Sequence, residues 1–240
     1  MEPVDLGQPV SGARLLIASL LWPVLTVVLL VATGVALRLL APAWLLAHPA
    51  DLVAFFLVEA YVALLASLLA CFGGPAGLVS RLGFRFTSWG DIALALLAWA
   101  GAFAVGGLLI AALTPLLGRP SSNAVPVLKR SFDPLFVALV VPTLGLLAPL
   151  SEELLFRGAF YGWLRRRLSV WVAAPLSAAV FAGVHLLPPL FPFFFTFGLA
   201  AALIRERSGS TLNTFAMHAT QNLLATAAAY AVISSGRAGG

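Results

Sequence analysis

The chain consists of long apolar segments separated by short polar ones. The apolar residues come in long runs rather than in the stripes of an amphipathic helix, so a soluble helical bundle is not indicated. Runs of 18 or more apolar residues are typical of transmembrane helices. The pattern therefore predicts an all-α fold, a polytopic transmembrane bundle of seven or eight helices. We expect helices at residues 15–37, 52–72, 90–117, 140–164, 170–188, 190–204 and 210–233.

Glycines, prolines and one short segment add detail to this outline. The third segment is long, and we expect it to be tilted or broken near Gly106 and Gly107. The sixth is short, which leaves an eighth crossing open. Pro134, Pro142 and Pro149 are expected to kink the approach to the fourth segment. A helical bundle tolerates such kinks when neighbouring helices satisfy the freed carbonyls.

Composition supports a membrane protein and limits the alternatives. Hydrophobic residues make up 61% of the 240 residues, charged residues 10%, and the mean hydropathy is +1.03. A soluble domain is usually closer to half apolar, and a transmembrane β-barrel needs a strand alternation that is absent. We expect a single integral-membrane domain over residues 1–240, with its most loop-like segment at 118–132.

The net charge of +5 comes mostly from arginines in the predicted loops. If the N-terminus is cytoplasmic, more Lys and Arg residues lie on the cytoplasmic side than on the other, and the cluster Arg165–Arg167 is among them. We interpret the charge as a determinant of orientation and of contact with anionic lipid. No motif supports a nucleic-acid partner. The lone cysteine, Cys71, cannot form an internal disulfide.

A few ionisable residues lie within the predicted spans, and each is a functional candidate because an unpaired charge there is costly. Glu153 and Arg157 are four residues apart on a helix and are expected to form a structural ion pair. Glu152 projects about 100° away from Glu153. It therefore needs a partner from another helix, or water. Glu59 has no patterned partner, and we interpret it as a polar contact between helices or with water.

Two further pairs have the same four-residue spacing. Phe181 and His185 begin and end FAGVH, and His218 and Asn222 begin and end HATQN. We expect Phe181 to pack beneath His185. A helix rises about 1.5 Å per residue, which places Glu152, His185 and His218 within roughly 10 Å of one depth in the membrane. This common depth predicts one buried polar site.

These residues suit hydrolysis by an activated water molecule. Glu152 would take a proton from water that His185 orients, and His218 with Asn222 would hold the developing oxyanion. No serine or cysteine in these motifs is an evident nucleophile. The rival mechanism is a zinc site with Glu152, His185 and His218 as ligands, although the HExxH spacing is absent. Apart from this alternative, we expect no cofactor.

The ordered motifs EELLFR, FAGVH and HATQN resemble the EExxxR, FxxxH and HxxxN motifs of the CPBP family. This family contains the CAAX proteases and bacteriocin-processing enzymes and is also called Abi. The resemblance covers roughly residues 130–233, which we take as the protease core. It implies an intramembrane endopeptidase of the glutamic type, with the catalytic roles given above. It also implies supporting roles for Glu153 and Arg157.

We therefore expect an intramembrane endopeptidase that cleaves a membrane-associated protein or peptide precursor. The expected location is a bacterial inner (cytoplasmic) membrane, with the N-terminus cytoplasmic. One alternative is a non-catalytic membrane scaffold or immunity protein of the same fold, and another is a zinc-dependent form of the protease. A small transporter would predict an inverted repeat, and the sequence contains none that we can find.

Overall fold

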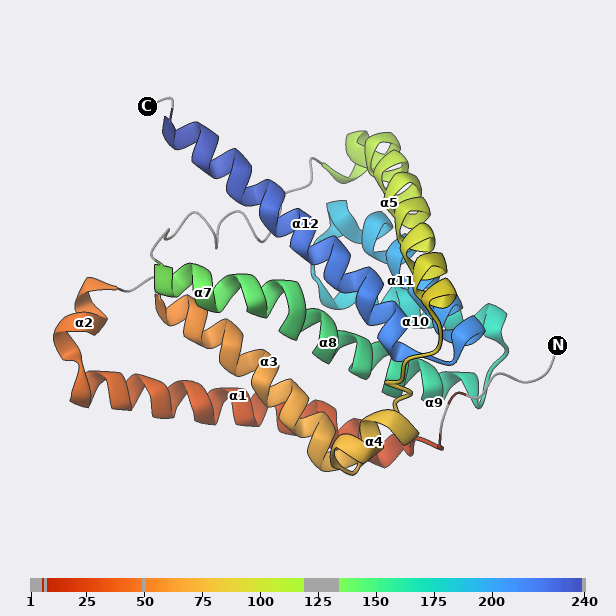
Figure 1. Ribbon diagram of the computed structural model, residues 1–240, viewed down its shortest axis with the longest axis horizontal. Helices are drawn as coiled ribbons and strands as arrows, with labels where there is room; N and C mark the ends of the chain where they lie inside the picture. The colour runs from red at the N-terminus through yellow and green to blue at the C-terminus, as the bar shows by residue number, and fades with distance from the viewer. Residues whose placement is uncertain (1–5, 7, 49–50, 119–133, 239–240) are drawn as a thin grey trace.

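The computed structural model describes residues 6, 8–48, 51–118 and 134–238, and all regular structure in these residues is helical (Figure 1). This confirms the predicted all-α class for the described part of the chain. The predicted loop 118–132 lies outside the described residues except for Gly118. The helices are α1 (Gly12–Leu40), α2 (Pro42–Ala47), α3 (Asp51–Phe72), α4 (Gly74–Ser80), α5 (Trp89–Leu117), α7 (Pro134–Pro142), α8 (Ala148–Glu153), α9 (Tyr161–Arg165), α10 (Val170–Val184), α11 (Phe191–Ser208) and α12 (Thr211–Ala238).

Five helical segments of the described chain are long and apolar enough to cross a membrane. This marks the chain as an integral membrane protein. Helix α10 is apolar but too short to be counted among them. The five segments therefore do not confirm the predicted number of seven or eight crossings. The five segments are Gly12–Leu40, Asp51–Phe72, Trp89–Leu117, Pro134–Arg165 and Pro188–Ser208.

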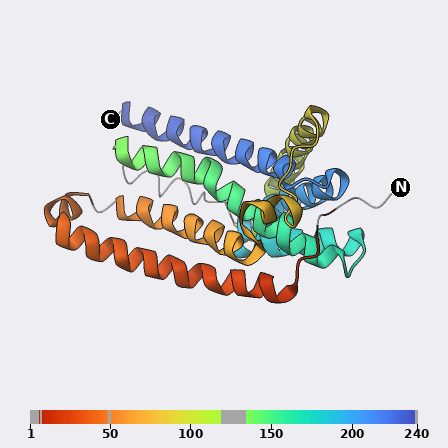
Figure 2. The same ribbon diagram turned by 60° about the horizontal axis from the view of Figure 1, so that its bottom comes forward.

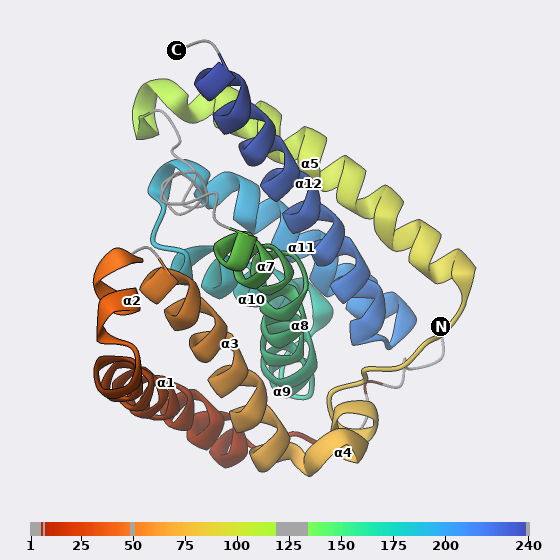
Figure 3. The same cartoon turned by 60° about the vertical axis from the view of Figure 1, so that its left-hand side comes forward.

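The helices form an outer pair, a central kinked helix and an inner group. Helix α1 packs against α3, and α3 in turn contacts α7 and α8. Helix α12 lies on the other side of α7 and α8, so that these helices are stacked side by side (Figure 2). Helices α5 and α10 both pack on α11, and α5 lies on the side away from the α1–α3 pair (Figure 3). The central helix is therefore covered by neighbours on both sides.

Helix α5 runs unbroken from Trp89 to Leu117, which contradicts a break near Gly106 and Gly107 and leaves the other expectation, a tilt, untested. Gly106 has a packing role instead. A Cβ at this position would lie 3.0 Å from side-chain atoms of Phe193 and Thr196 on α11. Small residues allow membrane helices to approach closely, so this glycine lets α5 and α11 pack in direct contact.

The central helix changes its winding where the sequence predicted kinks. Pro134 begins α7, and Pro142 and Pro149 flank a π-helical turn at Thr143–Leu147. A second π-helical turn, Leu154–Phe160, follows α8. Such wide turns inside α-helices occur frequently at functional sites. Here they flank the short α-helical segment that carries the two adjacent glutamates.

Segments that the sequence assigned to one side of the membrane meet at one end of the molecule. The Arg205 side chain, near the end of α11, donates a hydrogen bond to the backbone carbonyl of Leu6 over 2.9 Å. The backbone N–H of Gln8 donates to the carbonyl of Ser80 at the end of α4. Gly12 packs against Trp163 of α9, where a Cβ would lie 2.9 Å from the indole nitrogen. These contacts fix the start of α1 to the core.

Candidate active site

A buried ion pair lies at the centre of the site. Nη1 of Arg157 donates to Oε1 of Glu153 over 2.8 Å, and both side chains are fully buried. Nη2 of Arg157 donates to the backbone carbonyl of Gly198 on α11, and its guanidinium lies 4.2 Å from the ring centroid of Phe181. The four-residue spacing and the buried surroundings agree with the ion pair expected from the sequence.

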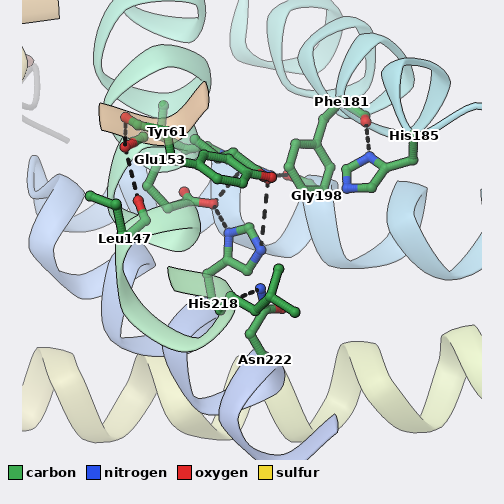
Figure 4. Close-up of polar contacts among 12 residues, drawn as sticks. Tyr61, Leu147, Glu153, Phe181, His185, Gly198, His218 and Asn222 are labelled. Atoms are coloured by element: carbon green, nitrogen blue, oxygen red, sulfur yellow. Dashed lines mark hydrogen bonds and ion pairs between the residues drawn. The ribbon is translucent and has the colours of Figure 1, made fainter. Parts of the chain in front are cut away.

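His218 on α12 joins this pair to the second glutamate. Its Nδ1 lies 2.8 Å from Oε1 of Glu153, within hydrogen-bond distance. Its Nε2 lies 3.9 Å from Oε2 of Glu152, which is too far for a direct hydrogen bond. An atom placed between them, such as a water or substrate oxygen, would be close to both. Figure 4 shows His218 beside Glu153, with Asn222 one turn further along α12.

Glu152 differs from its neighbour because it is only partly buried and lines a cavity. The rotation of about 100° between adjacent helical residues accounts for this difference. The sequence requires a partner for Glu152 from outside its own helix, and the partner is Tyr61 on α3. The Tyr61 hydroxyl donates to Oε1 of Glu152 over 2.9 Å. Oε2 is then the oxygen that lies toward His218.

His185 follows the last residue of α10 and lines the same cavity as Glu152. Its Nδ1 lies 2.7 Å from the backbone carbonyl of Phe181, and since a carbonyl only accepts, Nδ1 carries the proton. The ring stacks on Phe194 with a centroid distance of 3.9 Å. Phe181 also contacts His185, as the sequence predicted, and its ring lies between the two histidines (Figure 4). The imidazole is held with Nε2 free to accept a hydrogen bond in its neutral form.

Asn222 is positioned by the π-helical turn of the central helix. Its Nδ2 donates to the backbone carbonyl of Leu144 over 2.9 Å. In this turn the Ala148 N–H bonds to the carbonyl of Thr143, five residues earlier. The next N–H in that register would come from Pro149, which has none, so the Leu144 carbonyl lacks a helical donor. Asn222 supplies it, and one of its two amide N–H groups is therefore already used.

A cavity of about 730 Å³ lies next to Glu152 and His185. Its polar lining consists of these two residues with Tyr61 and Ser19. The other lining residues are almost all apolar and come from α1, α3, the second π-helical turn, α9 and α10. They are Gly12, Leu15, Leu16, Trp22, Leu64, Leu155, Phe156, Phe160, Trp163, Val180 and Val184. Ligand cavities commonly combine such an apolar wall with a few convergent polar groups.

The structure brings the predicted site residues into one region, with one correction to their arrangement. Glu153, Arg157 and His218 are directly hydrogen-bonded to one another in a chain, and Glu152 lies at its edge, 3.9 Å from His218. Among the described residues, His185 forms no hydrogen bond or ion pair with this group, but it lines the same cavity as Glu152. The ring of Phe181 lies against both His185 and His218. The roles of these residues in a reaction stay predictions. Their convergence from three separate helices meets the geometric requirement for a single site.

Tyr61 is the residue of this site that sequence reasoning missed. It belongs to an apolar helix outside the three motifs, and its partner lies 91 residues further along the chain. Glu59 on the same helix was singled out because it carries a charge. It accepts a hydrogen bond from Thr33 of α1, in agreement with its interpretation as a polar contact between helices. A tyrosine facing an unpaired glutamate has no local spacing by which it could be found.

Among the described residues, no group of three or more His, Cys, Asp and Glu side chains is arranged to hold a metal ion. The alternative zinc ligands Glu152, His185 and His218 therefore do not form a three-ligand site in this arrangement. Whether the activity depends on zinc stays a prediction for experiment.

Residues 134–224 match the protein-family model described as "Type II CAAX prenyl endopeptidase Rce1-like". This confirms the resemblance to the CAAX protease family that the motifs predicted. The matched segment contains Glu152, His185, His218 and Asn222, and it lies within the predicted core 130–233. No curated protein and no solved structure matches the chain. At a coarse level the match supports a protease in a lipid bilayer that acts on a protein or peptide.

Proposed function

We propose that the residues matching the CAAX endopeptidase model form an intramembrane endopeptidase of the glutamic type. In this proposal Glu152 and His185 activate a water molecule that hydrolyses a peptide bond. The observation that supports it most directly is the position of Glu152. This carboxylate lies on the wall of an apolar cavity, while the adjacent Glu153 is fully buried and neutralised by Arg157. One glutamate is thus available to a substrate, and the other is structural.

The proposed reaction begins with a water molecule between Glu152 and His185. Oε2 of Glu152 takes a proton as the water oxygen attacks the peptide carbonyl carbon, and Nε2 of His185 accepts a second hydrogen bond from the water. The tetrahedral intermediate then collapses with cleavage of the C–N bond. The protonated Glu152 returns its proton to the leaving amine, so the carboxylate is regenerated.

His218 and Asn222 are proposed to stabilise the oxyanion of this intermediate. Nδ1 of His218 donates to Glu153, so Nε2 carries a second proton only in the imidazolium form, and we propose that this form acts in the reaction. Its Nε2 lies 3.9 Å from Oε2 of Glu152, so it would be near the carbonyl oxygen of a substrate held at Glu152 and could donate to it. Asn222 keeps one amide N–H for this purpose, because the other is bonded to Leu144. Glu153 holds the ring of His218 through a hydrogen bond. Arg157 in turn holds Glu153 through the ion pair, and its guanidinium rests on the ring of Phe181. These three residues are proposed as supports.

The lining of the cavity indicates which chemical group lies near the cleaved bond of the substrate. Its wall is mostly apolar and formed in part by α1, which otherwise packs mainly on α3. A polypeptide with a long hydrocarbon group near the cleaved bond would bury that group here. The family description names a prenyl endopeptidase acting on CAAX sequences. We propose a lipid-modified, membrane-anchored protein or peptide as the substrate.

We propose seven membrane crossings, the lower of the two predicted numbers. They are the five long spans together with α10 and α12. The whole chain forms one membrane domain. The start of α1 and the ends of α4, α9 and α11 gather at one end of the molecule. This agrees with the side assigned to the N-terminus and to Arg165–Arg167. We propose that this end faces the cytoplasm of a bacterial cell, as the positive charge indicates.

The first experiment uses a peptide that ends in a CAAX sequence and carries a farnesyl group on its cysteine. The purified protein in lipid vesicles is expected to release the last three residues, and Glu152→Gln is expected to reduce the rate by about 10²–10⁴-fold. Glu59→Gln is the matched control, since it neutralises another carboxylate within a span, away from the cavity. Equal rates for the parent protein and Glu152→Gln would reject the proposed mechanism.

The second experiment identifies the native substrate and separates the alternatives. Membrane proteomes of cells with the parent protein and with Glu152→Gln are compared for a precursor that accumulates uncleaved. A biological effect that persists in Glu152→Gln cells at equal expression would favour the scaffold or immunity protein. Chelation that abolishes peptide cleavage, with recovery on stoichiometric zinc, would favour the zinc-dependent form.

A further inference from the structure

Helix α3 lies outside the segment that matches the protease family, yet it reaches the proposed catalytic carboxylate. The hydroxyl of Tyr61 donates to Oε1 of Glu152 over 2.9 Å. The backbone of the same residue is also held, because the Ser151 hydroxyl lies 3.3 Å from the Tyr61 carbonyl as well as 2.8 Å from the carbonyl of Leu147. Two hydrogen bonds therefore join α3 to α8 at the level of the glutamate.

The other side of α3 is attached in the same way to α1. The indole nitrogen of Trp22 donates to the carbonyl of Ala60 over 2.7 Å. Trp22, Tyr61 and Glu152 all line the cavity. Two separate hydrogen bonds, joined through the covalent chain of Ala60 and Tyr61, thus connect α1 with α3 and α3 with the carboxylate on α8. The backbone of α3 at Ala60 and Tyr61 is held from both sides, by Trp22 of α1 and by Ser151 of α8.

The contact has a chemical consequence for a glutamate that acts as a base. A carboxylate has two equivalent oxygens and rotates easily about its last side-chain bond. The Tyr61 hydroxyl occupies Oε1, and Oε2 then lies toward His218 at 3.9 Å. The rotation is restricted, and one defined oxygen is presented where the water and the peptide carbonyl would lie. Such positioning is what a preformed catalytic site requires.

We infer that Tyr61 is a positioning residue of the proposed hydrolysis, orienting Glu152 through its hydroxyl so that Oε2 faces the substrate. This inference rests on the proposed function and adds to it a residue that none of the three motifs contains. Tyr61 acts through Glu152 and need not touch the scissile bond. Its ring would also border any substrate group in the cavity, and the test must separate these two effects.

The test is Tyr61→Phe, which keeps the ring in the cavity wall and removes the hydroxyl. With the farnesylated CAAX peptide in lipid vesicles, kcat is expected to fall about tenfold, the size expected from losing one hydrogen bond to a charged group. KM is expected to change less than twofold, because the cavity surface is retained. A hydroxyl that only stabilised the fold would lower the midpoint of thermal unfolding and leave kcat unchanged.

The chain offers a matched control in Tyr161→Phe. The Tyr161 hydroxyl also donates to a glutamate, Glu206, over 2.8 Å, but it does so on α9 away from the cavity. This variant loses the same kind of hydrogen bond and is expected to keep the parent kcat. Equal kcat in Tyr61→Phe and in the parent protein would overturn the inference, as would an equal loss in both variants.

If Tyr61→Phe does not fold, 3-fluorotyrosine introduced at position 61 gives the same answer with little change of shape. It alters the strength of the hydroxyl as a donor, so kcat is expected to change at least twofold at constant KM. An unchanged kcat would overturn the inference. Failure of the parent protein to cleave the peptide is a different result. It would reject the proposed function and the positioning role with it, whereas cleavage insensitive to Tyr61 would reject the positioning role alone.

Discussion

The outer helices α1 and α3 and the central helix Pro134–Arg165 are all apolar enough to span a membrane, but they bury very different fractions of their residues. In the most apolar stretch of α1 only 11% of residues are buried, and in α3 28% are. In the central helix the value is 39%. The difference teaches that membrane-spanning character and membership of the core are separate properties. The outer helices face lipid and form a wall, whereas the central helix holds the charged site.

The same division holds for polar groups. The central helix and α12 hold Glu153, Arg157 and His218 in direct contact with one another. The outer pair contains one hydrogen bond between side chains, from Thr33 to Glu59, among the contacts described. A charge in the membrane is costly unless it is paired, so the concentrated charges of the inner region need complete packing. The outer pair holds fewer charged groups, among them Glu59, whose carboxylate accepts the hydrogen bond from Thr33.

The largest effect is expected from breaking the buried ion pair. Arg157→Leu removes the cation paired with the buried Glu153 and leaves this carboxylate with the hydrogen bond from His218, so the free energy of unfolding should fall by about 3–5 kcal/mol. The control is Arg165→Leu, which breaks the partly exposed pair with Glu206 and should cost less than about 1 kcal/mol. Denaturation in detergent micelles measures both. Similar losses of unfolding free energy in the two variants would mean that the buried ion pair contributes no more to stability than the partly exposed one.

A smaller loss is expected at the π-helical turn. Asn222→Ala leaves the part-buried carbonyl of Leu144 without a donor and should cost about 1 kcal/mol of stability. In that background, Pro149→Ala restores a backbone N–H in the right register and should recover about 1 kcal/mol. Thermal unfolding of the single and double variants compares them. No recovery in the double variant would show that the missing N–H of Pro149 is not the reason for the Asn222 contact.

The boundary between the two regions can be tested by filling the cavity. Val180 on α10 lines the cavity, and Val180→Phe should lower kcat/KM for the farnesylated peptide roughly tenfold, mainly through KM. Val172→Phe is the control, because Val172 is exposed on the same helix and does not line the cavity. Steady-state kinetics in vesicles distinguish them. If both variants behave like the parent, the substrate does not occupy this cavity.

The long helices lie where the sequence predicts them, because each apolar run ends where polar or turn residues begin, but their ends differ from the prediction by up to six residues, as in 140–164 against Pro134–Arg165. Two pairs of bounds agree to within one residue. The predicted 52–72 is observed as Asp51–Phe72, and 90–117 as Trp89–Leu117. In α5 the sequence cannot distinguish the two common uses of a glycine, a kink and a close helix contact. The contact of Gly106 with α11 shows that the second applies here. Helix boundaries are thus local properties, whereas the use of a glycine is not.

The site shows the same limit. Glu153 with Arg157 and His218 with Asn222 could be found because helical spacing or a motif relates them within five residues. Neither pattern contains Tyr61, whose partner is distant in the chain, or the Leu144 carbonyl, which is backbone. The π-helical turns were also missed, since prolines predict a disturbed helix but not the form that it takes. Spacing identifies residues that act together on one helix. Contacts between residues of different helices, such as that of Tyr61 with Glu152, are known only from the structure.

The smallest effect is expected in the outer pair, where it tests the comparison most directly. Thr33→Val removes the hydrogen bond to Glu59 between α1 and α3 and keeps the shape of the side chain. Hydrogen bonds between membrane helices contribute about 0.6 kcal/mol on average, so the loss of stability should be of that size. Thr26→Val on the same helix is the control, because the Thr26 hydroxyl bonds only to its own helix at Trp22. If Thr33→Val costs more than about 2 kcal/mol, beyond the range measured for such bonds, the outer pair depends on its polar contact as the inner region does. The α1 wall would then be a fixed part of the site rather than a helix held mainly by packing.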